Sequence, residues 1–166
     1  MIFAKIDFIN LLPFHIYIKK NIPSSQMKSI IEYKKSYPSN INKKYKKRKV
    51  DSAFISSIAS RNEKNLDFGI IAQKDVLSVL VIPGNEQDDF QSETSNALAK
   101  VLGYKGQVLI GDKALKYYHA NKNSDFIDLA QAWNDKYNLP FVFAVLCYSS
   151  NKILLDKYTR KFNKRH

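Results

Sequence analysis

Apolar positions along the chain alternate between short runs of strand length and longer stretches in which they recur every three or four residues. The short apolar runs predict β-strands, and the helical spacing predicts helices between them. Strands that alternate with helices are typical of an α/β fold. The predicted strands cover residues 1–7, 30–33, 52–55, 68–72, 77–82, 108–110 and 141–147, and the predicted helices cover residues 13–20, 40–49, 56–61, 94–102, 113–118, 128–137 and 152–162.

Within these helices, particular residues predict the ends and the buried faces. Ser39 is placed to cap the helix over residues 40–49, and Ile41 and Tyr45 have the spacing of core-facing positions. Gly103 is placed to end the helix that opens at Thr94 or Ser95. The pattern therefore predicts helices that each bury one face.

The alternation is interrupted at Pro83-Gly84 and the polar segment 85–91. A Pro-Gly pair followed by polar residues favours a turn, so we expect the chain to cross to a second lobe there and to return near Pro140. The prediction is two α/β lobes, residues 1–83 plus 140–166 and a smaller inserted lobe over residues 84–139. Ligands of such proteins bind in the cleft between the lobes.

Composition agrees with a globular protein. Hydrophobic residues make up 45% of the 166 residues, and aromatic residues 13%, which is enough for a packed core. No run approaches the roughly 20 apolar residues of a membrane span, and the N-terminal segment lacks the pattern of a secretory signal. A lone Cys147 offers no internal disulfide. We therefore expect a cytoplasmic protein with no membrane partner.

The formal net charge is +12, and the basic residues concentrate at 43–49 and 160–166. A basic excess of this size is compatible with nucleic acid, a membrane surface or small anions as partners. Because Tyr45 supplies an inward contact, the segment 43–49 indicates the solvated face of a helix. An RNA-binding surface would interleave more exposed aromatic residues. We therefore expect no nucleic-acid partner, whose binding would weaken steeply with salt.

Several well-known chemical motifs are absent from the sequence. The five glycines form neither a phosphate loop nor a dinucleotide-binding fingerprint. One cysteine and three histidines, His15, His119 and His166, show no metal-ligand spacing, and there is no nucleophile elbow. These absences weigh against nucleotide hydrolysis and covalent catalysis, and we expect neither a metal nor a cofactor.

Three polar segments stand where predicted strands end or helices begin. Asn10 offers two donors and an acceptor after the first strand, or satisfies groups of the turn itself. Ser56 and Ser57 stand where a buried strand meets a predicted helix, and Thr94 and Ser95 open a helix after the predicted hinge. Hydroxyl groups beside the free N–H groups of a helix N-terminus form a carboxylate site, or they cap the helix.

Three further residues have simple structural interpretations. His15, in the apolar first helix, indicates a structural histidine, although it is the one histidine near the predicted cleft. Asp112 is placed to cap the helix over residues 113–118. Trp133 is expected to pack in the core of the smaller lobe.

Six segments carry a family resemblance. In chain order they are KIDFINLLPF, VDSAFISSIAS, GIIAQKDVLSVLV, SETSNALAKVL, LIGDKAL and NLPFVFAV. Together they resemble the chorismate dehydratase family of the futalosine route to menaquinone, over residues 5 to 145. The resemblance implies a two-lobed fold like that of type II periplasmic binding proteins. It also implies a lyase that converts chorismate to 3-[(1-carboxyvinyl)oxy]benzoate without a cofactor.

Carried over by motif, the resemblance places five residues in the cleft, Asn10, Ser56, Ser57, Thr94 and Ser95. Dehydration removes a ring hydroxyl and the proton of the neighbouring carbon, and the developing charge passes to the ring carboxylate. Donors around that carboxylate would bind more tightly as its charge grows. None of the five is a base at neutral pH.

We therefore expect the enolpyruvyl carboxylate of chorismate itself to accept the proton, held in place by Asn10, with His15 as the alternative base. A different function remains open, that of a binding protein that holds a small carboxylate without converting it. The oligomeric state is left open as well.

Overall fold

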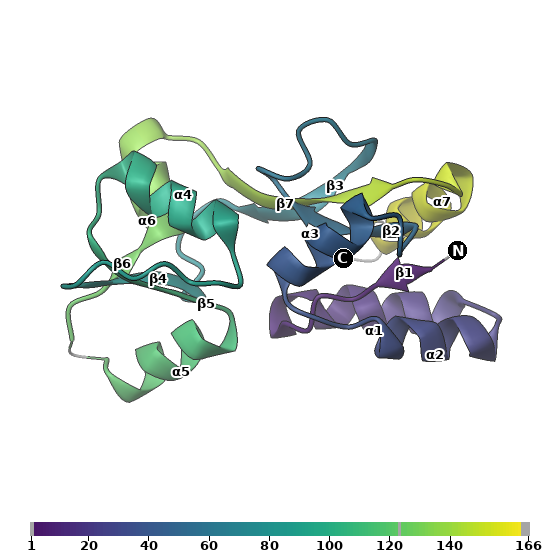
Figure 1. The fold of residues 1–166 in the computed structure, drawn as a ribbon, viewed down its shortest axis with the longest axis horizontal. Coiled ribbons are helices and arrows are strands. Elements are labelled where there is room, and N and C mark those ends of the chain that lie inside the picture. The colour runs from purple at the N-terminus through teal and green to yellow at the C-terminus, as the bar shows by residue number, and fades with distance from the viewer. Residues whose placement is uncertain (1, 123, 164–166) are drawn as a thin grey trace. The chain divides into compact units, whose positions relative to one another are not determined.

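The computed structural model of the chain describes residues 2–122 and 124–163, and the chain forms two compact units (Figure 1). Unit 1 comprises Met1–Gly69 and Ala144–His166, and unit 2 comprises Ile70–Phe143. Both units contain strands and helices, which confirms the predicted α/β class. Contacts within a unit do not locate a hinge, so the lobe boundaries predicted at Pro83 and Pro140 stay a prediction.

The larger sheet is four-stranded, with the order β1-β2-β7-β3. Its strands are β1 (Phe3–Ala4), β2 (Ser52–Ser56), β3 (Asn65–Ala72) and β7 (Phe141–Tyr148). β1 runs parallel to β2, and β7 runs antiparallel to β2 with Ala144 opposite Ser56. A side chain on Gly69 would collide with the carbonyl oxygen of Ala144, so glycine is required where β3 passes β7.

The helices of unit 1 are α1 (Leu12–Asn21), α2 (Ser25–Tyr33), α3 (Pro38–Lys46) and α7 (Lys152–Asn163), preceded by the 3-10 helix η1 (Ile9–Leu11). An ion pair between Lys19 and Glu32 joins α1 to α2, which run side by side (Figure 1). In α3, Ile41 and Tyr45 are fully buried against β2, as their spacing predicted.

An aromatic cluster forms the core of unit 1 around Phe14 of α1. The Phe14 ring lies 5.4 Å from Phe54 of β2, 5.0 Å from Phe68 of β3 and 5.3 Å from Phe162 of α7, measured between ring centroids. Aromatic pairs at such separations each contribute about 1 kcal/mol beyond their burial. The cluster fixes the start of α1, and with it the preceding η1 that carries Asn10.

Unit 2 is built on a three-stranded sheet with the order β5-β4-β6, in which both pairs of neighbours are antiparallel. Its strands are β4 (Val79–Pro83), β5 (Gly106–Ile110) and β6 (Ile127–Asp128). The helices α4 (Glu93–Leu102) and α6 (Leu129–Tyr137) cover one face of this sheet, and α5 (Asp112–Ala120) covers the other (Figure 1). Gly103 ends α4 in a left-handed conformation, as predicted.

Three predicted elements or caps in unit 1 are wrong. The segment 30–33 belongs to α2 and is not a strand, because Ser24 caps a helix that runs through it. Ser39 does not cap α3, which begins at Pro38 with Tyr37 in the capping position. The segment predicted as a helix at 56–61 is not one, because Ser56 ends β2 and residues 57–61 form hydrogen-bonded turns, so no helix N-terminus exists at Ser56.

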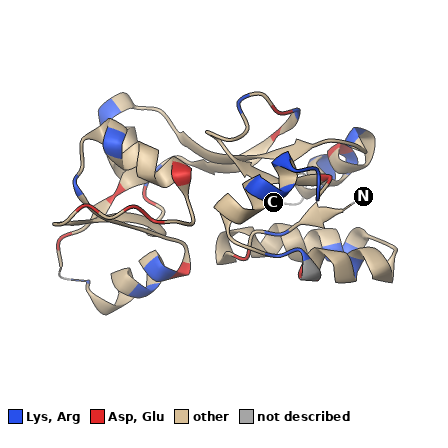
Figure 2. Cartoon of the chain, viewed as in Figure 1, with Lys and Arg blue, Asp and Glu red and all other residues tan. Residues whose placement is uncertain are grey.

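The basic segment 43–49, predicted as the solvated face of a helix, lies at the C-terminal end of α3 (Figure 2). Six of the seven residues at 43–49 are Lys or Arg, and Tyr45 among them is the buried one. Residues 164–166 of the basic tail predicted at 160–166 lie outside the described residues. None of the described helices is both long enough and apolar enough to cross a membrane.

Candidate functional site

Asn10 lies in η1, and its side chain is exposed. Within the described residues its amide makes no hydrogen bond to the protein, and η1 is closed by the Leu11 N–H, which donates to the Phe8 carbonyl. Because β1 and β2 are parallel neighbours, the chain after β1 and the end of β2 leave the sheet at the same edge. The Asn10 amide is therefore free of its own turn, and Asn10 follows β1, whose last residue Ala4 pairs with Ala53 of β2.

Ser56 is the last residue of β2 and is 4% exposed. Its hydrogen-bond partner is Asn42 of α3, which is itself 5% exposed and which sequence reasoning did not single out. The Asn42 Nδ2 donates to Ser56 Oγ at 2.7 Å, and the Ser56 N–H donates to Asn42 Oδ1 at 3.2 Å. The neighbouring Ser57 is half-buried, and its carbonyl accepts a hydrogen bond from the Ser60 hydroxyl.

Ser56 and Ser57 stand at the end of a strand and the start of a turn, without the helix that the sequence predicted. The predicted contribution of a helix N-terminus to anion binding is therefore absent at this position. What remains is a pair of hydroxyl groups at the C-terminal end of β2, of which the buried Ser56 is held in place by Asn42.

The first turn of α4 carries Thr94 and Ser95. The cap of this helix is Ser92 rather than either of them, which corrects the sequence prediction. Ser92 Oγ accepts from the Ser95 N–H at 3.2 Å and lies 2.9 Å from Ser95 Oγ. Thr94 Oγ1 is buried and has no hydrogen-bond partner among the described residues. The N-terminus of α4 therefore presents one hydroxyl engaged in the cap and one that lacks a partner.

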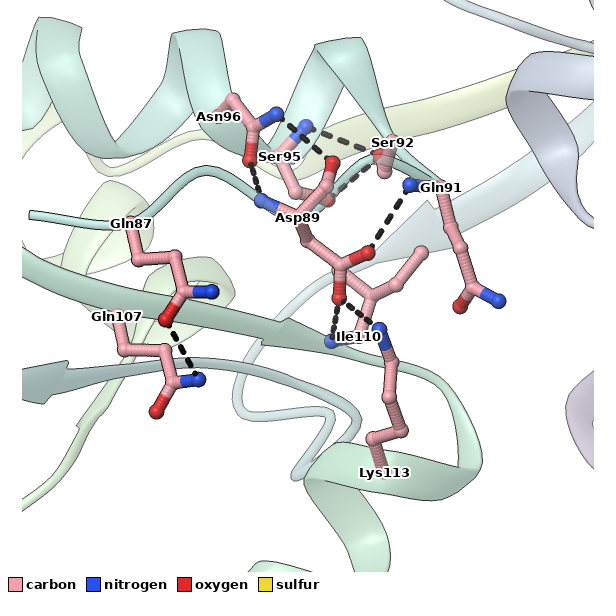
Figure 3. Close-up of polar contacts among 9 residues, drawn as sticks. All are labelled: Gln87, Asp89, Gln91, Ser92, Ser95, Asn96, Gln107, Ile110 and Lys113. Carbon is pink, nitrogen blue, oxygen red and sulfur yellow. Dashed lines mark hydrogen bonds and ion pairs between the residues drawn. The ribbon is translucent and has the colours of Figure 1, made fainter.

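A buried carboxylate, Asp89, fixes the loop that leads into α4 (Figure 3). Its Oδ1 accepts from the Gln91 N–H at 3.0 Å. Its Oδ2 accepts from the Ile110 N–H at 3.2 Å and forms an ion pair of 2.6 Å with Lys113. The Asp89 side chain is only 1% exposed, so these contacts replace its hydration.

Asn96 of α4 holds the same loop through its backbone. The Asp89 N–H donates to Asn96 Oδ1 at 2.9 Å, and Asn96 Nδ2 donates to the Asp89 carbonyl at 2.9 Å (Figure 3). The start of α4 is thereby tied to the end of β5 and the first turn of α5. Asp112 is the first residue of α5 and not its cap, which is Gly111.

His15 lies in the core of unit 1 and is 2% exposed. Its ring centroid is 6.0 Å from Phe3 and 6.2 Å from Phe14. Neither ring nitrogen has a hydrogen-bond partner among the described residues. Burial, reinforced by the positive charge of Lys5, lowers the pKa of His15 from 6.5 to about 4. His15 is thus a neutral core residue, as its sequence context indicated.

Acid should therefore weaken the fold through His15. The folded state favours the neutral imidazole, so the contribution of His15 to stability is complete above pH 6.5 and is lost as the pH falls from 6.5 toward 4. Between pH 7 and pH 5 we expect a loss of about 2 kcal/mol from this group. Urea unfolding at both pH values measures it, with His15→Leu as the comparison. An equal loss in the variant would assign the effect to other groups.

Cys147 is the one cysteine of the sequence. It is fully buried in β7, and burial raises the pKa of its thiol to about 12. At neutral pH the thiolate that covalent catalysis requires is therefore not populated.

Comparisons with known proteins find relatives in one metabolic route. A family model described as menaquinone biosynthesis matches residues 91–164. The chorismate dehydratase of Campylobacter jejuni subsp. jejuni serotype O:23/36 (strain 81-176) is 51% identical over 167 residues. That similarity covers 99% of this chain and 74% of the relative.

Proposed function

Because this chain belongs to the chorismate dehydratase family, we propose that it removes water from chorismate and yields 3-[(1-carboxyvinyl)oxy]benzoate in menaquinone biosynthesis. The observation that carries the proposal is the 51% identity over 99% of the chain. The match of residues 91–164 to the menaquinone family model agrees with it. The substrate is a small molecule with two carboxylates.

The finer architecture proposed is two lobes that hold chorismate between them, as in type II periplasmic binding proteins. Two features support it. In unit 1, Ser56 lies opposite Ala144, where β7 enters that unit. In unit 2, Asp89 ties the start of α4 to Ile110, which pairs with Val79 near the start of that unit's sheet. The candidates of unit 1 thus lie beside the point where β7 enters that unit, and those of unit 2 are tied to the strand end that pairs with the start of β4.

The proposed roles of the site residues follow from the negative charge that develops on the substrate during the reaction. Loss of the ring proton sends negative charge into the ring carboxylate, and loss of the neighbouring hydroxyl completes the aromatic ring. Hydroxyl groups of Ser56, Ser57, Thr94 and Ser95 would donate to the carboxylates of chorismate. Donors that are already fixed stabilise charge as it develops without first having to reorganise. Ser56 Oγ is held by the Asn42 amide, and Thr94 Oγ1 has no hydrogen-bond partner among the described residues, so each has a donor proton to offer.

The proposed proton acceptor is the enolpyruvyl carboxylate of chorismate, held by Asn10. The exposed amide of Asn10 has donors available for this purpose. The alternative base, His15, is 2% exposed and has its pKa lowered to about 4. His15 lies against Phe3 and Phe14 in the aromatic core of unit 1, so it is poorly placed to meet a carbon-bound proton of the substrate.

The proposal predicts that the protein converts chorismate to an aromatic product with no added metal or cofactor. Incubating the purified chain with chorismate and recording the ultraviolet spectrum tests it, and mass spectrometry should show the loss of one water. A heat-denatured sample is the control for spontaneous decay. If calorimetry shows that chorismate binds while the spectrum and mass remain unchanged, the protein is a carboxylate-binding protein and not a lyase.

A further inference from the structure

We infer that Asn42 is a positioning residue, which turns the hydroxyl of Ser56 into a hydrogen-bond donor directed at the substrate. This inference rests on the proposed function, because it names the group that prepares one of the proposed carboxylate donors. Asn42 belongs to α3 and Ser56 to β2, so both lie in unit 1 and their contact is internal to that unit.

The orientation of the Asn42 amide is fixed by chemistry. The backbone N–H of Ser56 can only donate, so the atom of Asn42 that faces it at 3.2 Å must be the acceptor Oδ1. The other end of the amide, Nδ2, therefore faces Ser56 Oγ at 2.7 Å and donates to it. A reversed amide would place two donors against each other at the backbone. The pair thus has one allowed polarity.

This polarity decides what the Ser56 hydroxyl can do. Since Oγ accepts the proton of Asn42, its own proton must point elsewhere. Within residues 2–122 and 124–163, no protein group accepts that proton. A buried donor without an acceptor is unfavourable, and a bound carboxylate removes that deficit. Asn42 thereby fixes the position of Oγ and leaves its proton for the ligand.

The simpler alternative is that the pair only joins α3 to β2. The two interpretations differ in what a change of polarity does. In Asn42→Asp, one carboxylate oxygen still accepts from the Ser56 N–H, and the other now accepts the Ser56 hydroxyl proton. The shape and the contact between α3 and β2 are retained, while the donor is turned away from the substrate.

The test compares chorismate affinity, by calorimetry, and turnover at pH 8 in wild type, Asn42→Asp, Ser56→Ala and the double variant. We expect Asn42→Asp and Ser56→Ala each to weaken binding about 10- to 100-fold, the range for a hydrogen bond to a charged group. In the Ser56→Ala background, Asn42→Asp should have little further effect, because there is no hydroxyl to redirect.

A matched control is Asn40→Asp. Asn40 lies on the same helix, its Nδ2 donates to Ser36 Oγ at 2.7 Å, and the substitution adds the same charge. It should change chorismate affinity by no more than about twofold, as expected for a screened surface charge. If Asn42→Asp behaves like Asn40→Asp, or if its loss persists undiminished in the Ser56→Ala background, the inference is overturned.

Circular dichroism first establishes that each variant folds. Should Asn42→Asp fail to fold, Ser56→Ala decides, because unchanged chorismate binding in that variant removes the donor that Asn42 is inferred to prepare. If wild type binds chorismate without converting it, the proposed lyase fails while the affinities still test Asn42. If wild type does not bind chorismate at all, both the proposed function and the inference are overturned.

Discussion

Replacing Asn10 by alanine is expected to lower kcat for chorismate by at least about 100-fold, the range for the loss of an oriented proton-transfer partner. The reason is that Asn10 holds the carboxylate that accepts the proton. The melting temperature should hardly change, because the Asn10 side chain is exposed and makes no hydrogen bond to the rest of the described chain. Steady-state kinetics followed at the product absorbance, together with thermal unfolding, measure both effects.

Two further variants sharpen this prediction. Asn10→Asp keeps the size of the side chain but loses the donors and repels a carboxylate, so its kcat should fall as far as that of Asn10→Ala. His15→Ala should retain kcat at temperatures where it is folded, since His15 is buried in the aromatic core. Full activity in Asn10→Ala, or loss of kcat in folded His15→Ala, would contradict substrate-assisted proton removal.

Local patterns in the sequence were sufficient to predict most of the elements. Tyr45 and Ile41 have helical spacing and are buried, and Gly103 ends α4 because only glycine takes up its left-handed conformation easily. These features depend on neighbours within one or two turns of the chain. For such features, the nearby sequence contains the information that decides the structure.

The errors occurred where two local signals compete. Serines at 57 and 60 favour a helix cap and a turn about equally, and the chain forms turns there. Ser92, Thr94 and Ser95 can each cap a helix, and the sequence alone does not rank them. In the structure, Ser92 takes the extended backbone of a cap, with its φ at −145°.

The groups that organise the candidate site could not be predicted for a different reason. Asn42 is separated from Ser56 by 14 positions, and Asp89 from Lys113 by 24. Nothing in the segment 86–92 distinguishes Asp89 from Asp88, because both are aspartates in a polar loop. Only the packing of α4 and β5 buries one carboxylate and leaves the other exposed.

That difference predicts a large and specific loss of stability in Asp89→Ala. The substitution leaves the N–H groups of Gln91 and Ile110 without their acceptor and removes the partner of Lys113. We expect unfolding to become easier by about 3 kcal/mol, which corresponds to a melting temperature lower by about 10 °C for a chain of this size. Asp88→Ala is the matched control, because its pair with Lys100 is exposed and should contribute less than about 1 kcal/mol.

The measurement can be assigned to unit 2, because the one tryptophan of the chain, Trp133, lies in α6 of that unit. Its fluorescence should report the lowered transition in Asp89→Ala, while circular dichroism follows both units. If Asp89 holds only unit 2 together, the two signals should separate, since two units need not unfold as one. Equal melting temperatures for Asp89→Ala and Asp88→Ala would mean that the buried carboxylate does not hold the start of α4. The fixed positions of Thr94 and Ser95, on which the proposed binding of a carboxylate depends, would then need another cause.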